Sequence, residues 1–169
     1  MSTPLIKGMI IPFNPVTRAL LTDGKVTFMY NPNKVTTSHK PSYQFNVGIT
    51  GNQAFAQYGS MSPQVISFSL FLRSKRFFTL TDDNADITEE IQSLNYLATP
   101  LDSNQGPPMA YLYLGNLVPT LAYSGVDNTD RTVTGVVSSL NVTISHMSRS
   151  LYPTQASVNL DFTISRRKL

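Results

Sequence analysis

The sequence predicts a mainly β protein: an antiparallel β-sandwich or barrel of about six or seven strands with one packed α-helix. Three observations predict this class. Several segments alternate polar and apolar residues with the period of two of a half-buried strand. A single segment repeats its apolar residues at helical spacing. The 169 residues show no repeat of solenoid length, so we expect one domain over residues 1–169.

The chain opens with an N-terminal arm, about residues 1–22, followed by a strand that ends at an Asn-Pro turn. Within the arm, a short strand is expected over residues 8–13. Pro12 places it at a sheet edge or ends it, because proline donates no backbone hydrogen bond. The Asp23-Gly24 dipeptide between apolar runs predicts a hairpin. Alternation then places three side chains on one face of the next strand: Val26, Phe28 and Tyr30.

A polar extended segment, Lys34–Phe45, follows the turn at Asn31-Pro32-Asn33. It has little apolar content for a core of its own, and Pro41 interrupts it. A ribbon of this kind is typical of a sheet edge that pairs with a partner. The glycine-dotted stretch after it, about residues 46–64, lacks the GxxxxGK[ST] pattern. We therefore expect a long ordered loop there rather than a phosphate-binding loop.

Four later segments are predicted strands. They are QVISFSLFLRS, MAYLYLGN, TVTGVVSSLNVTISHM and QASVNLDFTIS. The first has one wholly apolar face and one mixed face, as a half-buried strand does. The third contains a break or bulge near Gly135. Because the short link SRSLYPT joins the last two, we expect these two strands to form an antiparallel pair.

One helix is predicted over about residues 86–99. Asp86 is a good N-cap, Glu89 three residues later completes a capping box, and Pro100 ends the helix. Acidic residues crowd its N-terminus, which leaves a metal or acid–base site as an alternative, although capping and the helix dipole already account for most of them. The apolar stripe is Ile87, Ile91, Leu94 and Leu97, and the acids are Asp82, Asp83, Asp86, Glu89 and Glu90.

Composition restricts the classes of function. Charged residues are 14% of the chain, below the roughly 25% typical of soluble domains, so much of the surface is polar without charge or is covered by protein. The net charge of +3 is scattered apart from the residues 166–168, which argues against a nucleic-acid binder. The sequence shows no cysteine, no secretory signal pattern and no apolar stretch near the ~20 residues of a membrane span.

No constellation in the sequence predicts catalysis, a metal site or a cofactor. His39 and His146 are the two histidines, and neither belongs to an HxH or HExxH pattern. No serine lies in a GxSxG elbow. A pair of distant carboxylates for glycoside chemistry stays open, but few acids are present to form one. We therefore expect a protein that is not an enzyme and that holds neither metal nor cofactor.

Four stretches, in their order and spacing, resemble the N-terminal, tube-like domain of baseplate proteins from phages and contractile injection systems. They are VTFMYNPNKVTTSHKPSY, SPQVISFSLFL, PPMAYLYLGN and GVVSSLNVTISHMSRSLYPTQASVNLDFTI, and they span about residues 24–165. In that family a LysM module often follows, whereas none follows Ile164 here, and Gln155 stands where arginine is usual. The matching residues to which we assign a structural role are Phe28, Tyr30, Asn31, Pro32, Gly115, Gly135, Pro153 and Ala156.

The resemblance implies a tail-tube type of fold and a mechanical role. Such proteins form rings of about six copies that join the tail tube to the baseplate hub and spike. The implied partners are further copies of the chain, the tail tube protein, and the hub and spike proteins. The implied location is the virion tail or baseplate, assembled in the cytoplasm of a bacterial host. The lumen of such a ring passes DNA or another cargo without specific binding.

In a ring of this kind, the polar ribbon would pair with a neighbouring subunit's sheet by β-augmentation, which would cover its edge. The closing hairpin, residues 135–165, would make further contacts. The expected subunit contacts are Lys34, Val35, Thr37, His39, Tyr43, Phe45, Ser148, Arg149, Tyr152 and Pro153.

Two other functions stay open on the sequence alone. A monomeric carbohydrate-binding β-sandwich needs an aromatic platform on one face, which Tyr111 and Tyr113 would offer. A hydrolase on a β scaffold needs convergent acids, for which Asp82, Asp83 and Glu89 are the candidates.

Overall fold

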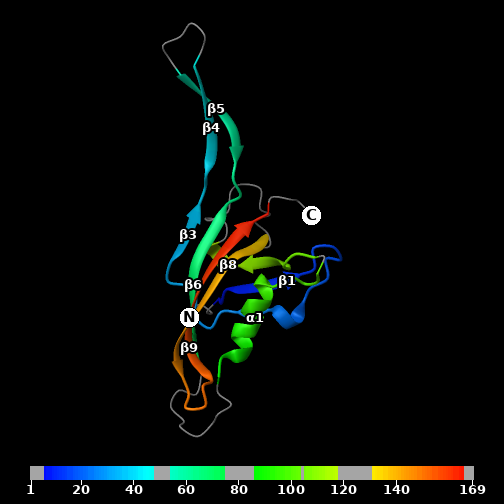
Figure 1. Cartoon of the computed structure of the whole chain (residues 1–169), viewed down its shortest axis with the longest axis vertical. Coiled ribbons are helices and arrows are strands. Elements are labelled where there is room, and N and C mark those ends of the chain that lie inside the picture. The colour runs from blue at the N-terminus through cyan, green and yellow to red at the C-terminus, as the bar shows by residue number, and fades with distance from the viewer. Residues whose placement is uncertain (1–5, 48–53, 75–85, 104, 118–130, 166–169) are drawn as a thin grey trace, which may run out of the picture.

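The computed structural model describes residues 6–47, 54–74, 86–103, 105–117 and 131–165. These residues form a seven-stranded antiparallel sheet, a separate two-stranded hairpin and one α-helix (Figure 1). The strand order of the large sheet is β2-β1-β7-β8-β9-β6-β3. For this part of the chain, the prediction of a mainly β, antiparallel fold with one packed helix is confirmed.

The elements follow the predicted order, except that the predicted ribbon is divided into two strands and one further strand is added. The strands are β1 (Met9–Phe13), β2 (Val26–Thr27), β3 (Val35–Ser38), β4 (Pro41–Val47), β5 (Ala54–Met61), β6 (Val65–Arg73), β7 (Met109–Tyr113), β8 (Thr132–Met147) and β9 (Pro153–Ile164). Helix α1 is Thr88–Ala98, and the short 3-10 turns η1 and η2 are Thr22–Gly24 and Gly115–Leu117.

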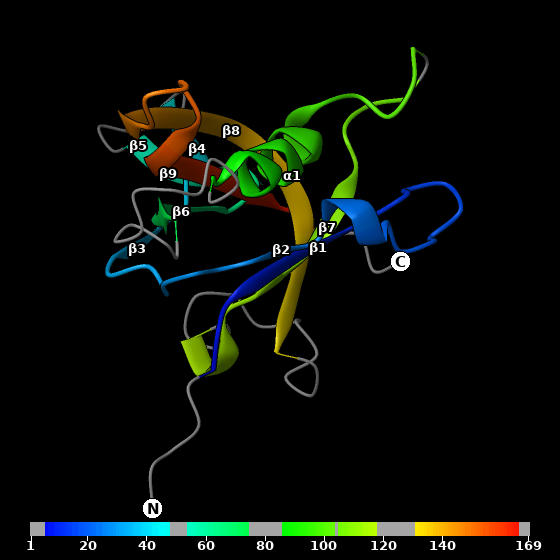
Figure 2. The same ribbon diagram turned by 90° about the horizontal axis from the view of Figure 1, so that it is seen from below.

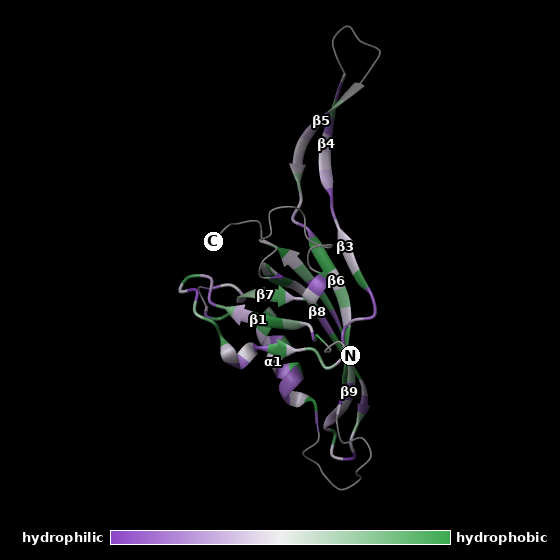
Figure 3. Ribbon diagram, turned by 180° about the vertical axis from the view of Figure 1, so that it is seen from behind, coloured by the Kyte–Doolittle hydropathy of each residue, from purple (hydrophilic) through white to green (hydrophobic). Residues whose placement is uncertain are grey.

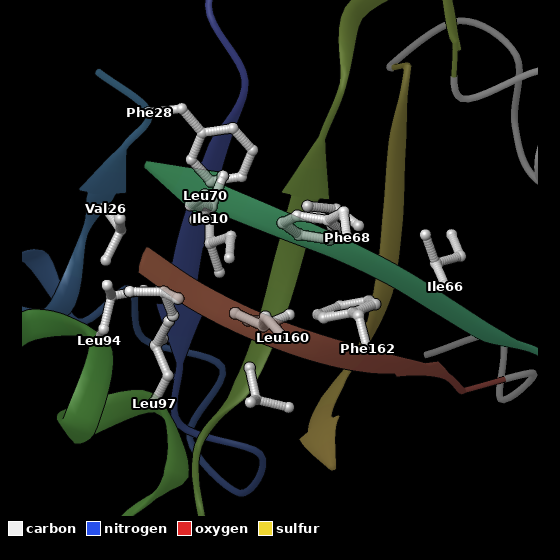
Figure 4. Packing of buried hydrophobic residues seen from close by; sticks show 14 of the residues in the cluster. Ile10, Val26, Phe28, Ile66, Phe68, Leu70, Leu94, Leu97, Leu160 and Phe162 are labelled. Atoms are coloured by element: carbon white, nitrogen blue, oxygen red, sulfur yellow. The ribbon is translucent and has the colours of Figure 1, made fainter. Parts of the chain in front are cut away.

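One face of the large sheet, together with α1, encloses the hydrophobic core. The sheet curls, so that Phe28, just after β2 at one edge, packs against Phe68 near the other edge with ring centroids 5.6 Å apart (Figure 4). The core is thus enclosed by a curled sheet, which is nearer to the predicted barrel than to a pair of facing sheets. The inward residues of β6 are those that alternation predicts: Ile66, Phe68, Leu70 and Leu72.

Helix α1 covers the open side of this core. Leu94 and Leu97 are fully buried and point into the same interior as Val26 and Leu160 (Figure 4). Figure 2 shows the helix against β8 and beside η1. Burying one leucine contributes about 1.5–3 kcal/mol, so packing of the apolar stripe, rather than helix propensity, holds α1 in place.

The start of α1 differs from the predicted capping box. The helix begins at Thr88, without a side-chain cap, and the Asp86 carboxylate accepts a hydrogen bond from the Thr88 hydroxyl at 2.7 Å. The N–H of Ile87 donates to the carbonyl oxygen of Pro153 at 3.1 Å. A tertiary contact with β9 therefore sets where the helix begins, and the expected residues 86–99 shorten to Thr88–Ala98.

The expectation of a long loop over residues 46–64 is wrong in its second half. Residues Ala54–Met61 form β5, which pairs antiparallel with β4. The alternation that marks a strand is weak there because Gly59 is an extra residue between the Ser42–Ser60 and Tyr43–Tyr58 pairs. Such a bulge shifts the side chains to the other face of the strand, which hides a period of two.

The irregularities of β8 lie elsewhere than predicted. The register shifts between Val137 and Ser139 and again near His146, whereas Gly135 pairs regularly with Ala110 and Ile164. Gly135 is required by close packing instead. A Cβ atom there would lie 2.7 Å from Cε1 of Phe162 and would also meet the carbonyl oxygen of Thr163.

The turn at Asn31-Pro32-Asn33 is hydrogen-bonded to the segment that precedes β1. The predicted strand over Val26, Phe28 and Tyr30 ends at Thr27, and the Tyr30 side chain is 55% exposed. Beyond the end of β2, the Asn31 side chain makes hydrogen bonds to the segment that precedes β1. Its Oδ1 accepts from the Gly8 N–H at 2.9 Å, and its Nδ2 donates to the Ile6 carbonyl at 2.8 Å. The side-chain amide thus imitates the backbone of a strand beside the chain that leads into β1.

The β1–β2 connection is longer than the two-residue hairpin that Asp23-Gly24 predicts. That dipeptide lies in η1, and β1 pairs with β2 only at Met9 and Ile10. Pro12 lies past the end of β2, opposite Ala110 of β7, where its missing N–H breaks no ladder with β2.

Candidate assembly surfaces

The β4–β5 hairpin extends away from the rest of the molecule at one end of its long axis (Figure 1). Every side chain described along it is exposed or half-buried, on both faces. A two-stranded hairpin alone in water is marginally stable, because neither face is covered. This hairpin is therefore the part of the described chain that most needs a partner.

The two faces of the hairpin differ in polarity. Residues directly opposite each other share a face, so Tyr43, Tyr58, Phe45 and Ala56 lie together. The rings of Tyr43 and Tyr58 meet edge to face at 5.9 Å, and Phe45 is 71% exposed. We call these four residues the aromatic face.

Among the side chains that the structure describes, the opposite face of the hairpin is polar. It carries Ser42, Gln44 and Gln57, and the Asn46 side chain donates a hydrogen bond to Oε1 of Gln57 at 2.9 Å. Figure 3 shows the hairpin standing apart from the strands of the body, which carry most of the hydrophobic colour. The described side chains of the hairpin thus form one aromatic and one polar face, and within the described ranges the aromatic face stays exposed.

The hairpin also lacks the charges that protect an exposed edge. No Asp, Glu, Lys or Arg occurs between Lys40 and Arg73. Natural proteins guard exposed strands with charges, proline or bulges, because free edges and apolar faces aggregate. Here Pro41 and the Gly59 bulge lie at the base of the hairpin, and the rest is unguarded.

Strand β3 forms an edge of the large sheet, as the ribbon prediction requires. It pairs with β6 on one side and ends the strand order. Within the predicted contact set, Val35 packs partly against the core, and the Thr37 hydroxyl accepts from the Gln64 side chain at 2.6 Å. Lys34 and His39 are exposed. The ribbon therefore divides into residues that serve the body and residues that are free for contact.

The β8–β9 turn lies at the opposite end of the long axis, in orange in Figure 1. Ser148 organises it: its N–H donates to the Tyr152 carbonyl at 2.8 Å, and its hydroxyl accepts from the Tyr152 N–H at 3.1 Å. Pro153 accepts the bond from Ile87, so both Ser148 and Pro153 have structural roles. Arg149 and Tyr152 are exposed.

Sequence reasoning missed the most exposed apolar residue of this turn. Leu151 is 75% exposed and has φ +64°, a left-handed conformation that costs a non-glycine residue energy. Met147 beside it is also exposed. A leucine that is exposed on a strained backbone is a candidate contact residue, and no local sequence signal predicts a positive φ at a leucine.

The remaining motif residues support the backbone. Gly115 has φ +58°, which suits glycine, in the turn η2 that follows β7. Ala156 is fully buried opposite Leu72. Pro32 is half-buried in the turn after β2.

A comparison with family models decides the family: residues 4–168 match the model described as contractile injection system tube protein. The chain belongs to this family. Comparison with curated proteins gives no match. A tube protein is a structural component of a tail, so membership suggests a non-enzymatic role. The family description names the tube and specifies no position along the tail.

For a tube protein, the alternatives raised by the sequence find little support. Tyr111 stacks on Phe13 at 4.6 Å, so one face of the proposed sugar platform is already covered. Of the acids considered for a metal or for hydrolysis, Asp82 and Asp83 lie outside the described residues. Within the described ranges, no group of His, Asp or Glu has the arrangement of a metal site, and no helix is long and apolar enough to cross a membrane.

Proposed function

We propose that this tube protein forms a closed ring of six copies, which joins the tail tube to the baseplate hub and spike. The observation that carries ring formation is the uncharged β4–β5 hairpin with its exposed aromatic face. The six copies and the position at the baseplate are supported by the four sequence stretches that resemble tube–baseplate adaptors. In this proposal the ring is part of a virion tail or a related injection machine, assembled in the cytoplasm of a bacterial host.

In the proposed ring, the hairpin of one copy lies on the body of the next. A cyclic ring needs a head-to-tail interface between two different surfaces, and an arm at one end of the molecule supplies one of them. The free edge of β3 and β4 offers backbone groups for β-augmentation. Burying Tyr43, Phe45 and Tyr58 contributes about 1.5–3 kcal/mol each before the cost of association.

The β8–β9 turn is the second contact surface in this proposal. It lies at the opposite end of the molecule from the hairpin, so a different neighbour can contact it (Figure 1). Leu151, Met147 and Tyr152 give it an apolar tip, and Arg149 gives it a charge. Partners of this tip in the proposal are the tube protein or the hub.

A matched pair of variants tests the hairpin contact. Phe45→Lys places a charge in the aromatic face, and Gln44→Lys places the same charge on the polar face of the same strand. We expect mass photometry and negative-stain images to show rings for the wild type and for Gln44→Lys, and their loss for Phe45→Lys. Both variants should unfold at the wild-type urea concentration, because both positions are exposed in the monomer.

Two outcomes would overturn the proposal. Rings that survive Phe45→Lys, or that survive removal of residues 34–43, would show that the hairpin and its ribbon are not the joint. If the wild-type chain were absent from purified tail particles, the proposal of a ring within the tail would be wrong. Gold labelling of a tag on the chain within intact particles tests the position: label at the tube–baseplate junction is expected, and label along the whole tube would contradict the adaptor role.

A further inference from the structure

The charges of the chain are segregated by sign along the sequence. Residues 24–76 contain no Asp or Glu, whereas residues 77–130 contain no Lys, Arg or His. The first block includes β2 to β6, and the second includes α1, β7 and η2. The rest of the chain carries both signs. The charged or titratable residues that the structure describes in the two blocks are Lys25, Lys34, His39, Lys40 and Arg73 in the first, and Asp86, Glu89, Glu90 and Asp102 in the second.

The first block supplies a basic edge of the large sheet. Strand β3 ends the strand order, so one of its two sides has no partner strand among the described residues. Lys34 precedes β3, His39 and Lys40 follow it, and all three side chains are exposed. We call these three residues the basic edge. Lysine at a strand edge repels partners of the same charge, so a protein that docks there needs acidic groups.

The second block supplies an acidic surface on α1. Glu89 and Glu90 lie in the first turn of the helix, where the helix dipole favours them. The same dipole favours a cation in the last turn, yet α1 has none there. Ser93 and Leu94 occupy the positions four residues later, where a lysine would pair with either glutamate. The negative charge of α1 is therefore not compensated along the helix, and we call Glu89 and Glu90 the acidic helix surface.

The basic edge and the acidic helix surface lie on opposite sides of the molecule, across its long axis. Strand β3 is at one edge of the sheet and β2 is at the other. Helix α1 contacts β8, η1 and β2, so it lies towards the β2 side. Figure 1 shows β3 and α1 on opposite sides of β6. Two different surfaces in this arrangement suit the head-to-tail contact of a cyclic ring.

The basic edge is also continuous with the β4–β5 hairpin, because Lys40 directly precedes Pro41 of β4. A neighbour that covers the hairpin therefore lies close to the basic edge as well. Lys34 and Lys40 flank β3 at its two ends, so their side chains leave the backbone groups of the strand accessible for β-augmentation.

We propose that the basic edge of one copy docks on the acidic helix surface of the next copy. This inference rests on the proposed ring, and it names the surface that receives the β3 side of each neighbour. Opposite charges on the two surfaces favour head-to-tail contact, and like charges oppose a pairing of two basic edges or of two acidic helices. The charge pattern thus selects cyclic closure over a back-to-back dimer.

Two charge-reversed chains test this contact. The edge-reversed chain carries Lys34→Glu and Lys40→Glu, and the helix-reversed chain carries Glu89→Lys and Glu90→Lys. In each chain alone, the two docking surfaces have the same sign. We expect mass photometry to show at least about a tenfold loss of ring formation for each chain by itself.

Rescue by complementary charge separates this contact from a general structural effect. A chain with all four substitutions has an acidic edge and a basic helix, so it should form rings again. An equal mixture of the edge-reversed and helix-reversed chains should also form rings in which the two alternate, because six copies allow strict alternation. A fusion that increases the mass of one of the two chains shows whether both enter the same ring.

Two controls accompany the reversals. Lys25→Glu makes the same charge change just before β2, away from β3, and should leave ring formation intact. Circular dichroism and urea unfolding show whether each chain is folded, since lysines in the first turn of α1 oppose the helix dipole. If the helix-reversed chain does not fold, Glu89→Gln and Glu90→Gln added to the edge-reversed chain remove the repulsion and should restore rings in part.

The remaining outcomes overturn the inference in distinguishable ways. Rings that both reversed chains form alone would show that the basic edge meets another partner, such as a hub protein. Rings that are lost and that neither the mixture nor the fourfold variant restores would show that the two surfaces do not meet. Absence of rings from the wild type overturns the proposed function itself.

Salt dependence gives a second measurement on the wild-type chain. The screening length falls from about 10 Å at 0.1 M salt to about 3 Å at 1 M. We expect the fraction of chains in rings to fall as sodium chloride is raised over this range, and the edge-reversed chain alone to gain rings because its repulsion is screened. Identical salt responses of the two chains would contradict the proposed contact.

Discussion

The body and the β4–β5 hairpin are built from similar residues but differ in what covers them. In the body, aromatic and aliphatic side chains alternate inwards and are buried by α1 and by the curl of the sheet. In the hairpin, the aromatic residues Tyr43, Phe45 and Tyr58 also share one face, yet that face is exposed. The core of the body is enclosed within one copy, whereas in the proposed ring a second copy covers the aromatic face of the hairpin.

The largest effect separates the two regions directly, by removing one phenylalanine from each. Phe162→Ala empties a fully buried site and should lower the free energy of unfolding by about 3–5 kcal/mol. Phe45→Ala removes the same ring from the hairpin and should change it by less than about 0.5 kcal/mol while weakening assembly. Urea unfolding monitored by circular dichroism measures both, and equal destabilisation by the two variants would contradict the comparison.

Close packing inside the body gives the next effect. Gly135→Ala adds a Cβ against the Phe162 ring and the Thr163 backbone, so we expect a loss of about 1–3 kcal/mol. Gly106→Ala is the matched control, because its Cβ meets nothing within 4 Å. Thermal unfolding of both variants decides the point: a stable Gly135→Ala protein would mean that β8 and β9 can move apart.

A smaller loss is expected where the Asn31 amide fastens the start of β1. Asn31→Ala removes two hydrogen bonds, to Gly8 and to Ile6, and should cost about 1–2 kcal/mol. Asn33→Ala, an exposed site in the same turn, should be neutral. Hydrogen exchange of the Gly8 amide provides the measurement, and unchanged protection in Asn31→Ala would show that the turn is held by Pro32 and by the hydrogen bond from the Phe28 N–H to the Gly8 carbonyl instead.

The smallest effect on folding concerns Leu151. Leu151→Gly relieves the left-handed backbone strain and should raise the free energy of unfolding by at most about 1 kcal/mol. It also removes the apolar tip of the β8–β9 turn, so incorporation into particles should fall. If the variant is stabilised but incorporated normally, Leu151 has a strained backbone and is not part of the contact surface.

The sequence by itself determined the strands that have one buried and one solvent face. In β6, β7 and β9 the period of two is complete, so hydrophobic burial fixes both the strand and its inward residues. The family resemblance singled out Gly115 as a motif residue, and the structure shows that it has a positive φ, which suits glycine. The family resemblance likewise came from these local patterns and agrees with the family match.

Tertiary structure decided the features for which local pattern is a weak guide. Strand β5 forms because β4 lies beside it, and the start of α1 depends on a hydrogen bond from Ile87 to Pro153, far away in the sequence. The same holds for the exposed Leu151 with its left-handed backbone. Each arises from contacts between segments distant in the chain, whose free energy no single stretch of residues contains.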